Sequence, residues 1–354
     1  MKIANIILTS KNGGAEQVFI DYSTVFKNLG HEVLAILKDD APYSDDIEAL
    51  KIPVKRIKNK LGYHDFFAIS NIKKYLEEFN ADIVVAHIGR AAHLARKAIK
   101  QIKNKKIILI AVNHSSNVKR SIGADLVISV NKEIFYRTIN LGQDQAKSFV
   151  VPNAIDLSDA VEVAPKIDLK NKTEIVIGAM SRIDKYKGFN HLVKALKNLE
   201  KISNKKFKLK IGGAGDYEEN LRNLVKELAL EDRVEFCGWV KDKKSFFNSI
   251  DIFCLPSLNE TFGLVLFEAI KYRKPVISTN CDGPKENLRN EIDGLLVNLE
   301  PLGNLADEIT EAVIKIINES ELTDKMIDNS FVRLKEKFSH KALEERIREI
   351  VGRA

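Results

Sequence analysis

Short apolar runs alternate with longer amphipathic segments along the whole chain of 354 residues. Runs such as Ile3–Leu8 and Ile107–Val112 have the length of buried strands and are far too short to span a bilayer. The segments between them, such as Ala15–Leu29, have the length and apolar spacing of helices. This alternation predicts parallel sheets covered by helices, because neighbouring parallel strands need long crossover connections.

Both halves of the chain follow this pattern. In the first half we expect strands at Ile3–Leu8, Val33–Leu37, Ile83–Ala86, Ile107–Val112, Leu126–Val130 and Ser148–Val151, and helices at Ala15–Leu29, Phe66–Phe79 and Ala91–Ile102. In the second half we expect strands at Glu174–Ala179, Lys208–Ile211, Val234–Cys237, Ile252–Leu255, Val276–Thr279 and Leu295–Val297. Its expected helices are Asn190–Lys201, Tyr217–Leu228, Lys243–Ser249, Phe262–Tyr272, Asn304–Ile317 and Lys341–Val351. The predicted fold class is α/β, with two Rossmann-like, doubly wound parallel-sheet domains.

A polar stretch that contains Pro152 and Pro165 separates the two halves. We expect an N-terminal domain at residues 1–156, a linker at 157–172, a second domain at 173–335 and a C-terminal helix at 336–354 that packs back towards the N-terminal domain. Doubly wound sheets bind ligands beyond the carboxyl ends of their strands. We therefore expect the site in a cleft between two facing domains.

The positive charge of the chain lies in its first part. The net charge is +7, of which residues 1–150 carry +8 and residues 151–354 carry −1. Nucleic acid, an anionic membrane surface and phosphorylated ligands all fit such a charge. The run Lys51–Lys60 holds five basic residues and no acidic one, and Tyr63, Phe66 and Phe67 follow it. Such a run can dock on anionic lipid headgroups, and a solvated basic loop explains it equally well.

The three cysteines, Cys237, Cys254 and Cys281, are too few for a disulfide framework, and no CxxC or HExxH string occurs. We expect free buried thiols and no structural zinc site. The first residues lack the longer apolar region of a signal peptide, so we expect a cytoplasmic protein.

Several turns that follow expected strands have the composition of ligand-binding loops. Gly13 and Gly14 open the first helix, and a second glycine-rich turn contains Gly213. Glycines let the backbone approach an anion closely, but each turn is also explained as a tight connection. Arg182 and Lys187 flank the loop after the first strand of the second half. They could hold one diphosphate or could simply be solvated.

The segment Pro256–Ala269 is the most informative one. We expect a helix to begin near Thr261, so that the amides of Phe262, Gly263 and Leu264 form an anion site at its N-terminus.

Two carboxylates, Glu260 and Glu268, lie in this segment, eight positions apart. On an ideal helix that is about 12 Å. Glycosidase carboxylate pairs are closer together, so the spacing is more typical of clamps on two ends of one long ligand. Glu268 has apolar neighbours and needs hydrogen-bond donors, which ligand hydroxyls would supply. Two exposed helix charges are the alternative interpretation.

Two histidines, His87 and His114, come directly after expected strands. Both are therefore expected on the ligand side of the sheet. A structural or solvent-exposed role explains either one alone.

Together these segments resemble the retaining glycosyltransferases of family 4, which have the GT-B fold of two facing Rossmann-like domains. The resemblance covers most of the chain and is closest between Gly178 and Val297. Its sharpest element is Glu260-x7-Glu268 inside P-S-x-x-E-x-F-G-L-x-x-x-E-A. The supporting elements are Arg182-x4-Lys187-Gly188, the Gly212-Gly213-x-Gly215 turn, Gly238, Lys274-Pro275-Val276 and Gly283-Pro284-x-Glu286. Two usual glycines are absent, because Ala154 and Arg273 occupy their positions.

The resemblance implies a role for each matched residue. Arg182 and Lys187 would hold the donor diphosphate and stabilise the leaving nucleotide. Glu268 would bind the ribose hydroxyls. Glu260 would bind the donor sugar, with help from the amides of Phe262 and Gly263. Gly13 and Gly14 would close on the sugar and phosphate, and His114 would lie near the reacting sugar as an aid to catalysis.

The activity that the resemblance implies is retaining, metal-independent transfer of a sugar (a hexosyltransferase type of reaction). The donor would be a nucleoside diphosphate-sugar, and the acceptor a glycan or lipid-linked glycan of the cell-envelope polysaccharide or lipopolysaccharide type. No cofactor is expected, and the chain has no Asp-x-Asp string. The basic N-terminal domain suggests peripheral contact with an anionic membrane at its cytoplasmic face, and no nucleic acid partner.

Three alternatives remain open. One is a sugar-nucleotide epimerase of the same fold. Another is a nicotinamide-dependent dehydrogenase, in which Asp39 or Asp40 would bind ribose, although the G-x-G-x-x-G motif is missing. The third is a basic nucleic-acid-binding protein.

Overall fold

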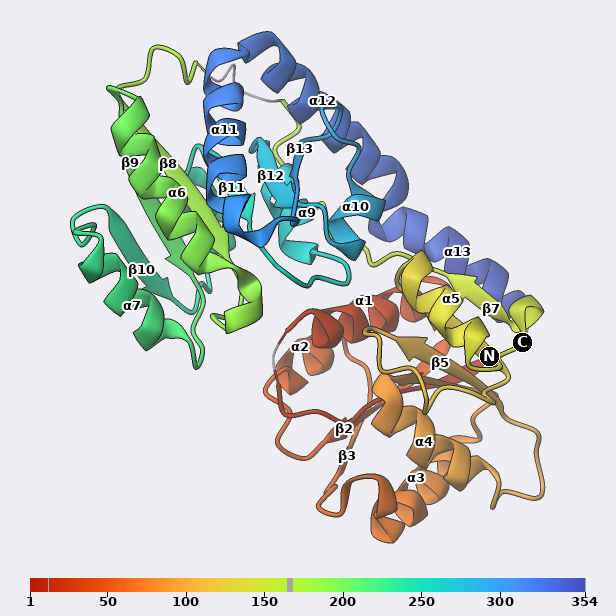
Figure 1. Ribbon diagram of the computed structural model, residues 1–354. Coiled ribbons are helices and arrows are strands. Elements are labelled where there is room, and N and C mark those ends of the chain that lie inside the picture. The colour runs from red at the N-terminus through yellow and green to blue at the C-terminus, as the bar shows by residue number, and fades with distance from the viewer. Residues whose placement is uncertain (12, 164–167, 354) are drawn as a thin grey trace. The chain divides into compact units, whose positions relative to one another are not determined.

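The computed structural model of the protein describes residues 1–11, 13–163 and 168–353. The chain forms two compact units (Figure 1). The first unit contains Met1–Ile155 and Lys337–Ala354, and the second contains Asp156–Glu336. Among the described helices, none has both the length and the apolar character needed to cross a membrane.

The first unit is built on a seven-stranded sheet of order β3-β2-β1-β4-β5-β6-β7, in which every pairing is parallel. The strands are β1 (Lys2–Ile7), β2 (Glu32–Lys38), β3 (Val54–Ile57), β4 (Ile83–His87), β5 (Ile108–Asn113), β6 (Leu126–Ser129) and β7 (Ser148–Val150). The helices are α1 (Gly14–Asn28), α2 (Ser44–Ala49), α3 (Phe66–Phe79), α4 (Ile88–Ile99), α5 (Lys132–Asn140) and α13 (His340–Gly352), with 3₁₀ turns η1 (Gly62–His64) and η2 (Gln145–Lys147).

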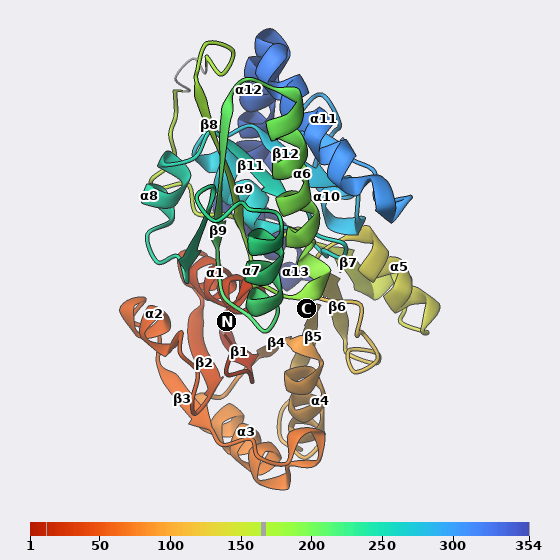
Figure 2. The same cartoon turned by 60° about the vertical axis from the view of Figure 1, so that its left-hand side comes forward.

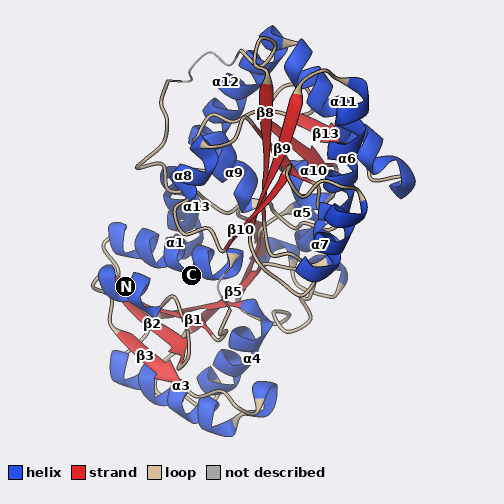
Figure 3. Cartoon of the chain, turned by 90° about the vertical axis from the view of Figure 1, so that its left-hand side faces the viewer, coloured by secondary structure: helices blue, strands red, loops and turns tan. Residues whose placement is uncertain are grey.

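Alternation along the central strands decides which face each side chain covers. Ala4 and Ile6 of β1 join the apolar core beneath α3 and α4. Asn5 points to the other face, where its Nδ2 donates to the carbonyl of Phe19 in α1 at 3.1 Å. Helices α1 and α3 accordingly cover opposite faces of the sheet (Figure 3).

The second unit is built on a six-stranded sheet of order β10-β9-β8-β11-β12-β13, again parallel throughout. The strands are β8 (Glu174–Met180), β9 (Lys206–Gly212), β10 (Val234–Gly238), β11 (Ile252–Leu255), β12 (Val276–Thr279) and β13 (Leu295–Val297). The helices are α6 (Phe189–Ile202), α7 (Glu218–Glu227), α8 (Lys243–Asn248), α9 (Leu264–Lys271), α10 (Asp282–Asn287), α11 (Leu305–Asn318) and α12 (Ser320–Lys337), with η3 (Lys185–Lys187) and η4 (Leu302–Asn304). Helices α6 and α11 pack side by side over one face (Figure 2).

In each sheet the order in which strands are added reverses beside the first strand. In the first unit β1 lies between β2 and β4, and in the second β8 lies between β9 and β11. At such a switch point the loops at the carboxyl ends of the strands diverge and leave room for a ligand. Functional residues are therefore expected in the loops after β1 and β4 and in those after β8 and β11.

Residues 157–163, part of the segment predicted as a linker, are attached to the second unit, and so is Asp156, which was predicted to end the first domain. The amide of Val161 donates to the carbonyl of Lys271 at 3.1 Å, and Lys271 forms an ion pair with Asp159. Arg273 donates from Nε to the carbonyl of Val161 at 2.9 Å and pairs through Nη1 with Asp328 of α12 at 3.0 Å. Arg273 has φ +56°, in the left-handed region that glycine adopts without steric cost. Its side-chain bonds offset the strain that the missing glycine introduces.

Candidate functional site

Two predicted site residues of the second unit form an ion pair. Lys187 lies at the end of η3 after β8, and Glu260 lies in the loop after β11. The Lys187 Nζ is 2.8 Å from the Glu260 Oε2, and each side chain is 17% exposed. The other carboxylate oxygen, Oε1, accepts a long hydrogen bond of 3.4 Å from the amide of Phe262. Sequence reasoning assigned Lys187 and Glu260 to different parts of a ligand and did not predict their contact.

A glycine brings the two loops together. Gly188 has φ +66°, and a Cβ on it would lie 1.9 Å from the carbonyl oxygen of Pro256. The amide of Leu258 donates to the carbonyl of Tyr186 at 2.8 Å. Only a residue without a side chain permits this backbone approach, so the glycine after Lys187 serves to place Lys187 beside Glu260.

A second glycine fixes the backbone of Glu260. The amide of Gly283, in α10, donates to the carbonyl of Glu260 at 2.9 Å. A Cβ on Gly283 would lie 2.5 Å from the backbone nitrogen of Phe262. Asn287 adds a hydrogen bond of 2.9 Å from Nδ2 to the carbonyl of Phe262. The Gly283-Pro284-x-Glu286 motif thus belongs to a helix that holds the Glu260 loop.

The predicted start of the following helix was wrong by two to three residues. Helix α9 begins at Leu264, not near Thr261. Gly263, with φ +82° in the left-handed region, precedes it as the N-cap and interrupts the helical conformation there. Phe262 lies before the helix and is 3% exposed. Of the three amides predicted as an anion site, only that of Leu264 belongs to the first turn.

Glu268 lies within α9 and is paired with a residue that sequence reasoning did not single out. The Lys243 Nζ, at the start of α8, is 2.7 Å from the Glu268 Oε1, and the Glu268 side chain is 13% exposed. The donor that this carboxylate needs is therefore present within the protein. The helical spacing assumed between Glu260 and Glu268 also fails, since only the part from Leu264 onwards is helical. No local signal in the sequence distinguishes Lys243 from other lysines.

Arg182 projects from the loop after β8, and its side chain is 64% exposed. Its Nε and Nη2 donate to the Asp184 Oδ2 at 3.0 and 2.9 Å. The loop rests on the glycine-rich turn after β9, where the amide of Ile183 donates to the carbonyl of Ala214 at 3.0 Å.

The glycine of that turn permits a close backbone contact. A Cβ on Gly213 would lie 1.9 Å from the carbonyl oxygen of Ser181. The amide of Gly213 donates to the carbonyl of Gly238 at 2.7 Å. These contacts favour the interpretation of this turn as a support for the Arg182 loop.

The two histidines singled out from the sequence touch each other in the first unit. The His87 Nδ1 lies 3.0 Å from the His114 Nε2, and the rings stack with centroids 5.2 Å apart. His87 is the last residue of β4 and faces α1, where its ring meets Phe19 and Tyr22 edge-on. At this distance the two nitrogens form a hydrogen bond, so the protonation of either ring is coupled to that of the other.

Burial keeps both rings neutral. It lowers the pKa of His114 to about 4. Burial, and then the neighbouring His114, hold the pKa of His87 well below its ordinary value. The next residue, Ile88, has φ +69°, which is a strained conformation for a β-branched side chain. Such strain is found most often at functional sites, where the surrounding structure maintains it.

The predicted glycine loop after β1 lies in the same unit. Gly13 is the N-cap of α1 with φ −172°, an extended conformation open to any residue, and Gly14 is the first residue of the helix. Both glycines are exposed. Residue 12, which precedes them, lies outside the described residues.

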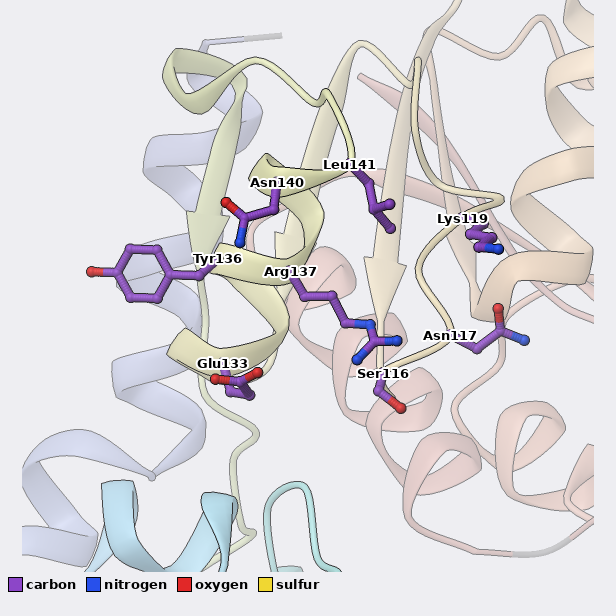
Figure 4. A pocket seen from close by; sticks show the side chains of 8 residues that line it. All are labelled: Ser116, Asn117, Lys119, Glu133, Tyr136, Arg137, Asn140 and Leu141. Carbon is purple, nitrogen blue, oxygen red and sulfur yellow. The ribbon is translucent and has the colours of Figure 1, made fainter.

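A hollow of about 530 Å³ opens on the first unit beside the His114 loop. Its walls come from that loop and from α5, and they are formed by Ser116, Asn117, Lys119, Glu133, Tyr136, Arg137, Asn140 and Leu141. The guanidinium of Arg137 points towards Ser116 and Asn117, while Tyr136 points away (Figure 4). Its polar and charged side chains can form hydrogen bonds with a hydroxyl-rich or anionic ligand.

Known families match the chain almost from end to end. Residues 12–159 match the model of "Glycosyltransferase Family 4", and residues 161–333 match that of "Glycosyl transferases group 1". The chain belongs to the group 1, family 4 glycosyltransferases. It is thus a glycosyltransferase, as the resemblance predicted.

Individual glycosyltransferases are similar to the chain over nearly their whole length. An uncharacterized glycosyltransferase from Haemophilus influenzae is 28% identical over 345 residues, covering 94% of this chain and 95% of that protein. The lipopolysaccharide core biosynthesis glycosyltransferase LpsE from Rhizobium meliloti is 25% identical over 94% of each chain.

Solved structures support the fold. The HepE protein from Anabaena, in complex with UDP and glucose, superposes with a TM-score of 0.83 at 21% identity and full coverage of both chains. The lipopolysaccharide outer core galactosyltransferase WaaB gives 0.78 at 20% identity, over 99% of each chain. The GT-B fold class predicted for this family 4 member is thereby confirmed.

Proposed function

We propose that the protein is a retaining, metal-independent hexosyltransferase that moves a sugar from a nucleoside diphosphate-sugar to a glycan or lipid-linked glycan. The observation that carries this proposal is the Lys187–Glu260 pair, held at 2.8 Å by two glycine-permitted backbone contacts. It combines a cation suited to a diphosphate with a carboxylate suited to sugar hydroxyls.

In the proposed reaction the bond between the anomeric carbon and the diphosphate oxygen breaks, and the diphosphate leaves with the electron pair. Lys187 and Arg182 stabilise the negative charge that develops on it. The acceptor hydroxyl forms the new bond on the same face of the sugar and gives its proton to the leaving phosphate. Glu260 positions the donor sugar, and Glu268 binds the ribose hydroxyls.

Both cations are neutralised by carboxylates in this structure, Lys187 by Glu260 and Arg182 by Asp184. A diphosphate would share or replace these partners. The exchange costs little for the exposed Arg182, because surface ion pairs contribute little stability.

The neutral His114 completes the proposed machinery near the reacting sugar. A neutral imidazole places no further charge beside the reacting sugar. The contact of its Nε2 with the His87 Nδ1, at 3.0 Å, fixes the orientation of the ring.

For the acceptor, we propose a glycan of the lipopolysaccharide or O-antigen type. The similarity to a lipopolysaccharide core glycosyltransferase supports this class. A relative named for galactose transfer to a diphosphoundecaprenol-linked sugar, 23% identical, supports lipid-linked acceptors. The hollow lined by Arg137 and Lys119 would bind part of that glycan. We also propose that the protein acts at the cytoplasmic face of the membrane, in peripheral contact with it.

The test is a panel of UDP-, GDP- and ADP-sugars, assayed for donor hydrolysis and for transfer to lipopolysaccharide-type acceptors. One donor should be consumed, and the activity should remain when a chelator is present. NMR of the product should show that the anomeric configuration of the donor is preserved. Lys187→Ala and Arg182→Ala should each lower turnover by about a hundredfold or more. Lys185→Ala removes an exposed neighbouring cation and should leave turnover unchanged.

Two results would contradict the proposal. Near wild-type turnover in both Lys187→Ala and Arg182→Ala would exclude the assigned site. Conversion of the donor to its epimer without transfer would identify an epimerase instead.

A further inference from the structure

The most exposed aromatic pair of the first unit lies at the start of α3. Phe66 is 73% exposed and Phe67 is 78% exposed, and the preceding turn adds Leu61 at 59%. Large apolar side chains gathered in this way are unfavourable in water and mark interaction surfaces. We call Leu61, Phe66 and Phe67 the apolar tip.

The apolar tip is held by a rigid turn. The carboxylate of Asp65, which is almost fully buried, accepts hydrogen bonds from the amides of Lys60 and Leu61 at 2.8 and 3.1 Å. Its other oxygen caps α3 by accepting from the amide of Ala68 at 3.0 Å. These bonds hold the pKa of Asp65 below its ordinary value against the effect of burial. The exposed side chains therefore sit on an ordered support, so less conformational entropy is lost on binding.

Positive charge lies next to the apolar tip, in the residues that precede it and over Tyr63. Lys58 and Lys60 are exposed and form no ion pair with any residue that the structure describes. Within η1, the ring of Tyr63 carries the guanidinium of Arg120 at 4.8 Å and that of Arg90 at 5.9 Å.

The structure also shows which cations of the basic run Lys51–Lys60 are neutralised by carboxylates. Lys55 pairs with Glu78 and Arg56 with Glu48, at 3.6 and 2.9 Å. These two cations are already compensated. Among the described ion pairs none involves Lys51, at the start of the run, or Lys58 and Lys60, next to the apolar tip.

We infer that the apolar tip inserts into a lipid bilayer that carries anionic headgroups. This inference gives the proposed peripheral membrane contact its surface, and it does not depend on the transfer reaction. Apolar side chains flanked by lysine and arginine match the two layers of a bilayer surface, since the aromatic rings enter the acyl boundary while the cations meet lipid phosphates.

The apolar tip lies on the side of its sheet where the strands have their carboxyl ends. It follows the carboxyl end of β3. His87 is the last residue of β4, and His114 follows the carboxyl end of β5 in the same parallel sheet. A bilayer bound there would present lipid-linked acceptors on the side of the unit where His114 lies.

The inference is tested with the full chain and two kinds of vesicle, phosphatidylcholine alone and phosphatidylcholine mixed with phosphatidylglycerol, by flotation. Wild type should bind the mixed vesicles and release them at high salt. The double variant Phe66→Ser, Phe67→Ser should bind about a hundredfold more weakly, about tenfold for each ring. The matched control Ile202→Ser, Val332→Ser removes apolar side chains of 61% and 53% exposure from the second unit and should bind as wild type.

A second pair of variants tests the charges. Lys58→Gln with Lys60→Gln should weaken binding and reduce its salt dependence. Lys103→Gln with Lys106→Gln makes the same charge change in the exposed loop before β5, at the opposite edge of the sheet, and should have less effect.

Three outcomes overturn the inference. The first is that wild type does not bind anionic vesicles at low salt. The second is that the phenylalanine double variant binds these vesicles as tightly as wild type does. The third is that the double variant still binds lipid but loses self-association. Soluble donor hydrolysis should be unchanged by the phenylalanine substitutions. Its absence in wild type would refute the proposed reaction and leave the vesicle result standing.

Discussion

Acidification should destabilise the first unit through its histidine pair. His114 has a pKa of about 4 in the folded protein and an ordinary value near 6.5 in the unfolded chain. As the pH falls below 6.5, protons bind the unfolded chain first, so stability is complete above that value and is lost towards pH 4. At about pH 5 the loss from His114 alone is roughly 2 kcal/mol, and protonation of His87 acts in the same direction.

The measurement is the free energy of opening of β4 and β5, from amide hydrogen exchange corrected for the intrinsic rate, at about pH 7 and pH 5. The protein's single tryptophan, Trp239, lies in the second unit, so fluorescence does not report on this one. His114→Asn should remove the roughly 2 kcal/mol of pH dependence, whatever it does to the absolute stability. His64→Asn, which replaces an exposed histidine of the same unit, should retain it. An equal loss on acidification in wild type and His114→Asn would refute the reasoning.

Three further predictions concern the second unit. Gly188→Ala should lower the free energy of unfolding, measured by urea denaturation, by more than about 2 kcal/mol, because the new Cβ meets the carbonyl of Pro256. Gly238→Ala, at φ +62° with open space around it, should lower it by only about 1 kcal/mol, and equal losses would contradict the contact. Lys243→Ala should lower the free energy of unfolding by about 1–3 kcal/mol, because the Glu268 carboxylate loses its partner. Adding Glu268→Gln should recover part of that loss in the same denaturation assay. Arg273→Ala should cost about 2–3 kcal/mol and make residues 156–163 more susceptible to limited proteolysis, whereas an unchanged cleavage pattern would show that Arg273 does not hold this segment.

Much of the fold could be predicted from the sequence, because buried parallel strands are continuous apolar runs. The elements that were missed lack this signature. Strand β3 has only four residues, of which Lys55 and Arg56 are exposed at the edge of the sheet. Helix α2 is short, and α12 is mostly polar, with few apolar residues such as Met326 and Phe331 in its buried stripe.

The candidate site was predicted more successfully as a set of loops than as a geometry. Residues placed just after strands were found because parallel strands bring their carboxyl ends to one edge. The partners were not predictable, since Lys187 meets Glu260 across 73 positions of sequence. That contact depends on the left-handed Gly188, and Lys243 reaches Glu268 from a helix with no distinguishing pattern.

The first unit is interrupted in the sequence by the whole of the second. Helix α13 contributes Leu343, Ile347 and Ile350 to its buried residues, and His340 contacts Asp21 of α1 at 3.1 Å. During synthesis the second unit therefore emerges complete while the first unit still lacks residues 337–353. A ribosome that stops after Lys337 would release a chain in which the part made first is the part left unfinished.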